Sequence, residues 1–88
     1  MSSMTNEFIK KKILFRSSHR GTKEMDLLLG NFVKKYINIL NKNELQDLDK
    51  ILQIEDDNIQ KWYFEKNYEN IILNSKVAIM LKKFKPND

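Results

Sequence analysis

Apolar residues recur at helical spacing along most of this chain. The clearest case is the segment 23–40, where apolar side chains return at steps of three or four residues: Met25, Leu28, Leu29, Phe32, Tyr36 and Leu40. That period gathers them on one face of an α-helix. No segment of the sequence alternates apolar and polar residues between turn signals, as a half-buried strand does. The sequence therefore predicts an all-α fold, a small compact bundle of five short helices.

The first two predicted helices are separated by a glycine. We expect the first helix over residues 6–18, with Ile9 and Ile13 on one side. Gly21 is expected to stop it, because glycine takes the left-handed backbone conformation at low steric cost. The second helix is expected over residues 23–40, where the apolar period is strongest.

The next two helices are predicted from residues that favour helix starts. Asn41 and Glu44, three positions apart, are typical of a capping box and begin the third helix. Asp56 or Asp57 is expected to cap a short fourth helix. That helix carries Trp62, which we interpret as a core anchor, because a short helix needs a large apolar side chain to stay docked.

The fifth helix is expected to begin between residues 70 and 74. Its buried side chains would be Leu73, Val77, Met80, Leu81 and Phe84. The whole chain, residues 1–88, is then one helical domain with its core over 6–84 and flexible termini at 1–5 and 85–88. A domain of this size buries only about 60–65% of the surface that its unfolded chain exposes, which leaves little room for a catalytic cavity.

Composition removes most kinds of reactive site. The sequence contains no cysteine and a single histidine, His19, which excludes disulfides, thiolate metal sites and a histidine cluster for zinc. It also contains no glycine-rich phosphate loop and no complete catalytic set. We therefore expect that the protein is not an enzyme and has no catalytic, metal-binding or cofactor-binding residues.

The sequence also bears on location. No apolar segment approaches the roughly 20 residues that a membrane-spanning helix needs, so we expect no membrane insertion. The first dozen residues lack an apolar signal core. They contain Glu7 and no arginine before Arg16, which is unlike an organellar presequence. We expect a protein of the bacterial cytoplasm.

The basic residues are distributed unevenly by type. The formal net charge is +4, and of the 16 basic residues only two, Arg16 and Arg20, are arginines. Both lie in or beside the stretch HRGTKEMD, residues 19–26. Arginine offers a planar fork of donors that lysine cannot copy, so their placement indicates a geometric need there. We interpret the lysines at 10–12 as a solvated face.

The same stretch and a later segment carry a family resemblance. Residues 19–32 read His-Arg-Gly-x-x-Glu-x-Asp-Leu-Leu-Leu-Gly-x-Phe, and residues 56–62 read Asp-Asp-Asn-Ile-x-x-Trp. Together they resemble the succinate dehydrogenase FAD-assembly factor family, over about residues 8–84. The chain departs from the family pattern at His19, where arginine is usual, and at 22–23, where apolar residues are usual. Histidine replaces the charge of arginine only when it is protonated.

The resemblance implies a five-helix protein that binds the flavoprotein subunit of succinate dehydrogenase, or of the related fumarate reductase, and promotes covalent attachment of FAD to a histidine of that subunit. The FAD then belongs to this client subunit, and the chain itself binds no cofactor stably. We expect it to be a monomer when free. The residues to which we assign partner binding are Arg16, His19, Arg20, Gly21, Glu24 and Asp26.

Some of these residues also have a purely structural interpretation. Gly21 either lets the backbone approach the partner closely or only stops a helix. Arg20 suits a bidentate contact with a carboxylate or carbonyl groups of the partner. Glu24 and Asp26 either bind the partner or hold the Arg20 side chain, and both also favour the first turn of a helix.

The alternative from another class is a small basic helical nucleic-acid-binding protein. A helix, a glycine turn and a second helix in a chain of pI about 9.3 superficially fit that class. Against it, the helix after the glycine opens with Glu24 and Asp26, whose carboxylates would face phosphates, and continues with apolar residues. We therefore expect no nucleic-acid partner.

Overall fold

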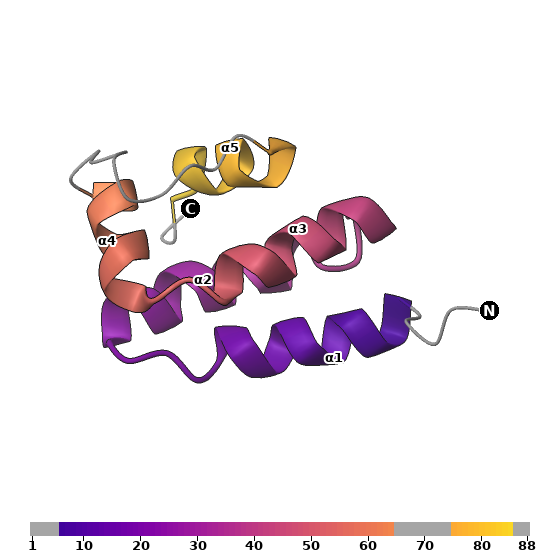
Figure 1. The fold of residues 1–88 in the computed structure, drawn as a ribbon, viewed down its shortest axis with the longest axis horizontal. Coiled ribbons are helices and arrows are strands. Elements are labelled where there is room, and N and C mark those ends of the chain that lie inside the picture. Colours follow the sequence, from indigo (N-terminus) through magenta and orange to yellow (C-terminus); the bar gives the residue numbers. More distant parts are fainter. Residues whose placement is uncertain (1–5, 65–74, 86–88) are drawn as a thin grey trace.

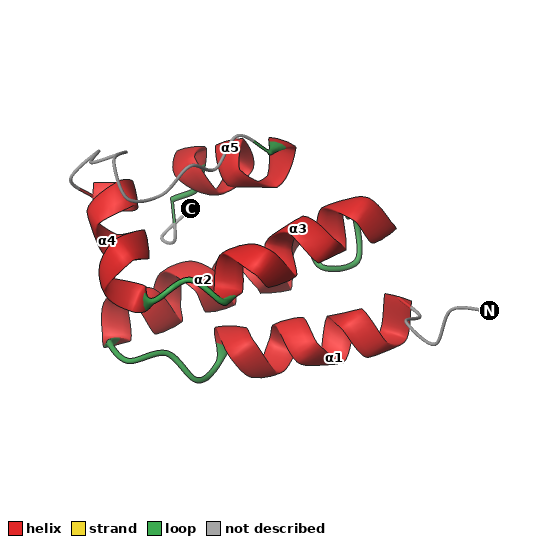
Figure 2. Cartoon of the chain, viewed as in Figure 1, coloured by secondary structure: helices red, strands yellow, loops and turns green. Residues whose placement is uncertain are grey.

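A computed structural model describes residues 6–64 and 75–85 of the chain (Figures 1 and 2). Within these ranges it contains five helices and no strand, which confirms the all-α prediction. The helices are α1 (Asn6–Ser17), α2 (Lys23–Tyr36), α3 (Lys42–Leu52), α4 (Asp56–Phe64) and α5 (Lys76–Lys83). None of the helices in the described part of the chain is long and apolar enough to cross a membrane.

Three helices lie along the long axis of the molecule. In Figure 1, α1, α2 and α3 run lengthwise, and α1 packs against both of the others. Helix α4 turns across one end, and α5 packs on α3. The connection between α1 and α2 and the connection between α3 and α4 lie at the same end. Segments about 35 residues apart in sequence can therefore meet there.

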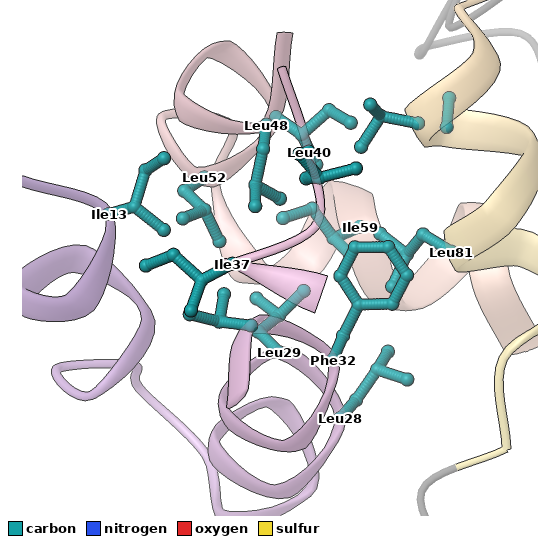
Figure 3. Packing of buried hydrophobic residues seen from close by; sticks show 14 of the residues in the cluster. Ile13, Leu28, Leu29, Phe32, Ile37, Leu40, Leu48, Leu52, Ile59 and Leu81 are labelled. Carbon is teal, nitrogen blue, oxygen red and sulfur yellow. The ribbon is translucent and has the colours of Figure 1, made fainter. Parts of the chain in front are cut away.

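The core is one apolar cluster to which all five helices contribute. Figure 3 shows the Phe32 ring of α2 among aliphatic side chains from other helices, among them Leu48, Ile59 and Leu81. Trp62 is 3% exposed, so its predicted role as a core anchor is confirmed. Burial of so large a ring contributes more to the stability of the fold than burial of most other side chains does.

Helix α2 is shorter than predicted. It ends at Tyr36 instead of Leu40, and the chain closes with turn hydrogen bonds from the N–H groups of Ile39 and Leu40 to the Tyr36 carbonyl, at 2.9 and 3.1 Å. Ile37 and Leu40 are nevertheless buried. The apolar period thus continues through the turn, and the weak helix formers at 37–39 allow the chain to leave the helix.

The predicted capping box of α3 is confirmed. The Glu44 N–H donates to Asn41 Oδ1 at 2.8 Å, and the Asn41 N–H donates to Glu44 Oε1 at 2.9 Å. The predicted cap of α4 is wrong. Asp56 is already the first residue of that helix, and the Glu55 carbonyl accepts from the N–H groups of Asn58 and Ile59. The Asp56 carboxylate instead contacts Arg20.

Helix α5 begins later than predicted. Ser75 has an extended backbone, with φ −73° and ψ 161°, and its Oγ accepts from the Ala78 N–H at 3.1 Å, so Ser75 is the N-cap. Of the predicted core side chains, Val77 and Leu81 are buried, whereas Met80 and Phe84 are partly buried against the cluster. The predicted burial of Leu73 and the predicted flexible termini, apart from Lys85, lie outside the described residues.

Candidate partner-binding site

The loop between α1 and α2 comprises residues 18–22. At its start, polar side chains form hydrogen bonds with carbonyl groups in the last turn of α1. Ser18 Oγ donates to the Phe15 carbonyl at 3.1 Å, and His19 Nδ1 lies 2.7 Å from the same oxygen. Ser17 Oγ donates to the Leu14 carbonyl at 3.2 Å. These side chains compete with backbone N–H groups for the carbonyl groups, so the helix can end here without a glycine.

Gly21 does not stop α1, contrary to the prediction. The helix ends four residues earlier, and Gly21 does not have the positive φ of the left-handed conformation. Its lack of a side chain has another use. A Cβ at this position would lie 3.1 Å from Asp56 Oδ2, and the Gly21 N–H donates to that same oxygen. Glycine is therefore suited to this position because the backbone closely approaches a carboxylate of α4.

Arg20 joins the loop to the connection between α3 and α4. Its Nε and Nη2 contact Asp56 Oδ1 at 2.6 and 2.5 Å. Nη1 donates to the Leu52 carbonyl at 2.6 Å, and Nη2 donates to the Ile54 carbonyl at 2.9 Å. We call this set of contacts, together with the Gly21 N–H to Asp56, the Arg20 clasp. All three guanidinium nitrogens are used inside the chain, and the side chain is only 8% exposed.

The acidic residues of the stretch do not hold the Arg20 side chain. Asp26 Oδ1 accepts from the Arg20 backbone N–H at 3.1 Å, and its side chain remains exposed. The Glu24 side chain is exposed and makes no hydrogen bond or ion pair within the part of the chain described. Both lie in the first turn of α2, as predicted. There Thr22 is the N-cap, with its Oγ1 accepting from the Met25 N–H at 3.2 Å.

Arg16 makes a second internal ion pair, between α1 and α3. Its Nη1 lies 2.5 Å from Asp49 Oδ1, and Lys12 Nζ lies 3.6 Å from Asp49 Oδ2. Gln53 Nε2 donates to Asp49 Oδ2 at 3.3 Å. The Asp49 side chain is 12% exposed and that of Arg16 is 33% exposed, so Arg16 keeps one edge at the surface.

His19 points away from the core. Its ring stacks on the exposed ring of Phe15, with centroids 4.1 Å apart and an angle of 26° between the planes. His19 Nδ1 also lies 3.0 Å from Ser18 Oγ. The side chain is thus exposed and held in one orientation, which reduces the conformational entropy that a contact with a partner would cost.

The structure brings the six predicted residues together at one end of the molecule but divides them by exposure. His19, Gly21, Glu24 and Asp26 are exposed, whereas Arg20 is nearly buried, and Arg16 is intermediate. Sequence reasoning did not assign Asp56 to the site, although the 56–62 segment was part of the family pattern. No group of three or more metal-ligating side chains occurs among the described residues.

Most of the chain matches a known protein family. Residues 11–85 match the family described as flavinator of succinate dehydrogenase. The chain belongs to this family. The matched range contains the whole loop, the Arg20 clasp and Trp62. No solved structure matches the chain.

Curated relatives carry matching names. The chain is 36% identical over 55 residues to the FAD assembly factor SdhE of Acetobacter pasteurianus, covering 62% of this chain and 50% of the relative. It is 36% identical over 89 residues to the mitochondrial succinate dehydrogenase assembly factor 2 of Scheffersomyces stipitis, covering 96% and 59%. It is 40% identical over 60 residues to the factor of the same name from Dictyostelium discoideum, covering 68% and 43%. The chain thus spans about half the length of these relatives.

Proposed function

We propose that this protein is an assembly factor that binds the flavoprotein subunit of succinate dehydrogenase and promotes covalent attachment of FAD to it. The observation that carries the proposal is the family match over residues 11–85, which includes the loop and its clasp. The names of the bacterial and mitochondrial relatives support it. Fumarate reductase, whose flavoprotein subunit is related, is the second possible client.

In this proposal the chain contributes a docking surface and no chemistry. The flavin and the accepting histidine of the client supply the reactivity, and the assembly factor stabilises the subunit conformation that aligns them. The chain then needs no catalytic residue and no cofactor of its own, and FAD stays with the client. We further propose that it acts in the cytoplasm and is a monomer when free.

The six site residues take two different roles. We propose that His19, Gly21, Glu24 and Asp26 contact the client, because their exposed atoms lie on one loop and the first turn of the next helix. Arg20 cannot offer its fork to a carboxylate of the client while the fork holds Asp56. It acts instead by fixing the loop. Arg16, on α1, joins that helix to α3 through Asp49 and keeps an exposed edge beside the surface.

The nucleic-acid alternative receives no support from this surface. Glu24 and Asp26 are exposed at the start of the helix that would enter a groove, and carboxylates there repel phosphates. Both arginines already hold aspartates of the same chain, Arg20 through Asp56 and Arg16 through Asp49. We propose that nucleic acid is not a partner.

Covalent flavin provides the test. The apo flavoprotein subunit is incubated with FAD, with and without this chain, and then denatured, and in-gel flavin fluorescence is measured. The proposal expects the chain to increase covalent flavin and to co-purify with the subunit. Equal covalent flavin with and without the chain, and no co-purification, would overturn it. A tight, salt-sensitive complex with duplex DNA would favour the alternative.

A further inference from the structure

Helix α1 carries an aromatic and basic face that its packing against the core does not use. Phe8, Lys11 and Phe15 lie at helical spacing on the side away from the buried Ile9 and Ile13, and Lys12 lies at the edge of that side, next to α3. We call these four residues the α1 outer face. The Phe8 side chain is 48% exposed and that of Phe15 is 63% exposed. Two phenylalanines two turns apart are a large apolar area to leave in water.

The rings of this face are held in place. Lys12 Nζ lies 5.8 Å from the centroid of the Phe8 ring, a cation–π distance. Phe15 is stacked by His19, which belongs to the loop of the proposed site. The stripe Phe8, Phe15 and His19 is therefore continuous with the proposed client-binding loop. A partner that covers the loop would have this stripe beside it.

The charge around the rings is positive. An open hollow of about 330 Å³ on the helix is lined by Lys11, Lys12, Phe15 and Arg16. Lys12 and Arg16 share the single carboxylate of Asp49. Lys11 is exposed and makes no ion pair with any residue that the structure describes. The hollow therefore has an excess of cations at the edge of an apolar ring, which complements a carboxylate that lies next to an apolar side chain.

We propose that the α1 outer face docks an acidic, partly apolar segment of the client flavoprotein subunit, with a carboxylate at Lys11 and an apolar side chain on Phe15. This inference rests on the proposed function and extends its contact surface along α1. A protein segment fits better than a membrane surface. The stripe is a single row of rings along the helix, it has lysines on both sides, and it leads directly into a loop proposed to bind protein.

The test measures binding of the apo client subunit to immobilised wild-type chain and variants. We expect Phe15→Ser to weaken binding roughly tenfold, as for a central apolar contact. Lys11→Glu should weaken it about threefold or more, with the loss shrinking at high salt because the charge is exposed. The controls are Ile39→Ser, at an apolar side chain that is 70% exposed in another turn, and Lys34→Glu, on the exposed side of α2. Both should bind like wild type.

A second arm identifies the acidic group directly. A carbodiimide joins a lysine amine to a nearby carboxylate as an amide, with loss of water. We expect a cross-link from Lys11 to an Asp or Glu of the client, which Lys11→Arg should abolish while binding persists, because arginine keeps the charge but does not form this amide.

The outcomes separate the two proposals. Wild type that binds the client, together with Phe15→Ser and Lys11→Glu variants that bind equally well, overturns the α1 inference alone. No client binding by the wild type overturns the proposed function as well. Retention of wild type on vesicles of phosphatidylcholine and phosphatidylglycerol, lost in these variants while client binding is unchanged, would replace the acidic segment with a lipid surface.

Discussion

The two arginines of this chain lie four residues apart and each meets an aspartate more than 30 residues away, yet their environments differ. Arg16 joins α1 to α3 through Asp49, which Lys12 and Gln53 also contact, and a third of the Arg16 side chain remains exposed. Arg20 is nearly buried and holds Asp56 together with two backbone carbonyls of the connection between α3 and α4. The first pair joins two rigid helices, whereas the second fixes a loop.

That difference distinguishes residues that are exposed at a surface from residues, such as Arg20, that fix the conformation of the backbone beneath it. A loop of residues 18–22 has little apolar packing of its own and depends on fixed hydrogen bonds for one conformation. The Arg20 clasp supplies them from two sides, through the guanidinium and through the Gly21 N–H. A buried arginine can thus be essential for a binding surface without touching the partner.

The largest expected effect is at the buried pair. Asp56→Ala leaves the Arg20 guanidinium nearly buried without its carboxylate, which should cost about 3–5 kcal/mol of unfolding free energy. Since small domains are typically stable by about 5–15 kcal/mol, such a loss approaches the limit of folding. Urea denaturation followed by circular dichroism measures it. A loss below 1 kcal/mol would show that the clasp does not hold the loop.

The pair with the more exposed arginine should tolerate the same change better. Asp49→Ala releases Arg16 and Lys12, each 33% exposed, and both can turn toward water. We expect a loss of about 1–2 kcal/mol, less than for Asp56→Ala. Double-mutant cycles for Arg16 with Asp49 and Arg20 with Asp56 sharpen the contrast. A larger coupling energy for Arg16 with Asp49 than for Arg20 with Asp56 would reverse the comparison.

Gly21 provides a smaller perturbation of the clasp. Gly21→Ala adds a Cβ 3.1 Å from Asp56 Oδ2, so the carboxylate must shift by a few tenths of an ångström. Because the Gly21 backbone has no positive φ, no further strain is expected, and the loss should be about 1 kcal/mol or less. Thermal denaturation measures it, with Gly30→Ala as a control, since a Cβ there meets only the Ser17 carbonyl at 4.0 Å.

The smallest expected effect on stability is at Glu44, whose carboxylate accepts a hydrogen bond in the capping box of α3. The hydrogen bond from the Asn41 N–H lowers the pKa of Glu44 below its ordinary value of 4.5, and Lys76 adds to this. A lowered pKa in the folded state means that the ionised carboxylate stabilises the fold above about pH 4.5 and that this is lost as the pH falls through the folded-state value. Glu44→Gln should therefore be less stable than wild type at pH 7, and the difference should shrink as the pH falls below about 4.5. A difference that grows on acidification would contradict this.

Part of the fold could be predicted where local rules agree with packing, as at the start of α3, whereas the predicted cap of α4 was wrong. The capping box at Asn41 and Glu44 and the burial of Trp62 both follow from short-range chemistry. The end of α2 could not be predicted from its apolar period, because Ile37 and Leu40 are buried by a turn instead of a helix. A period reports which side chains are buried and not which backbone conformation places them there.

The sequence indicates which residues lie around the loop but not the contacts that they make. The arginine pair, the glycine and the first-turn carboxylates lie at one end of the molecule, and their role in partner binding stays a prediction. Sequence could not show that Arg20 holds Asp56, because that contact links segments 36 residues apart that meet only after α3 and α4 have packed. For the same reason Gly21 was interpreted as a helix stop, although its close neighbour is a carboxylate.

The central claim is that the loop held by the Arg20 clasp is the surface that acts on the client. Gly21→Arg tests it most directly, because the position is exposed and an added side chain would project from the loop into any contact made there. Ile39→Arg, in the turn at the other end of α2, is the matched control. Covalent flavin fluorescence of the denatured client is measured for each variant beside a melting curve. The account predicts folded variants, with covalent flavin reduced to the level without the chain for Gly21→Arg and unchanged for Ile39→Arg. A folded Gly21→Arg variant that supports wild-type levels of covalent flavin would contradict it.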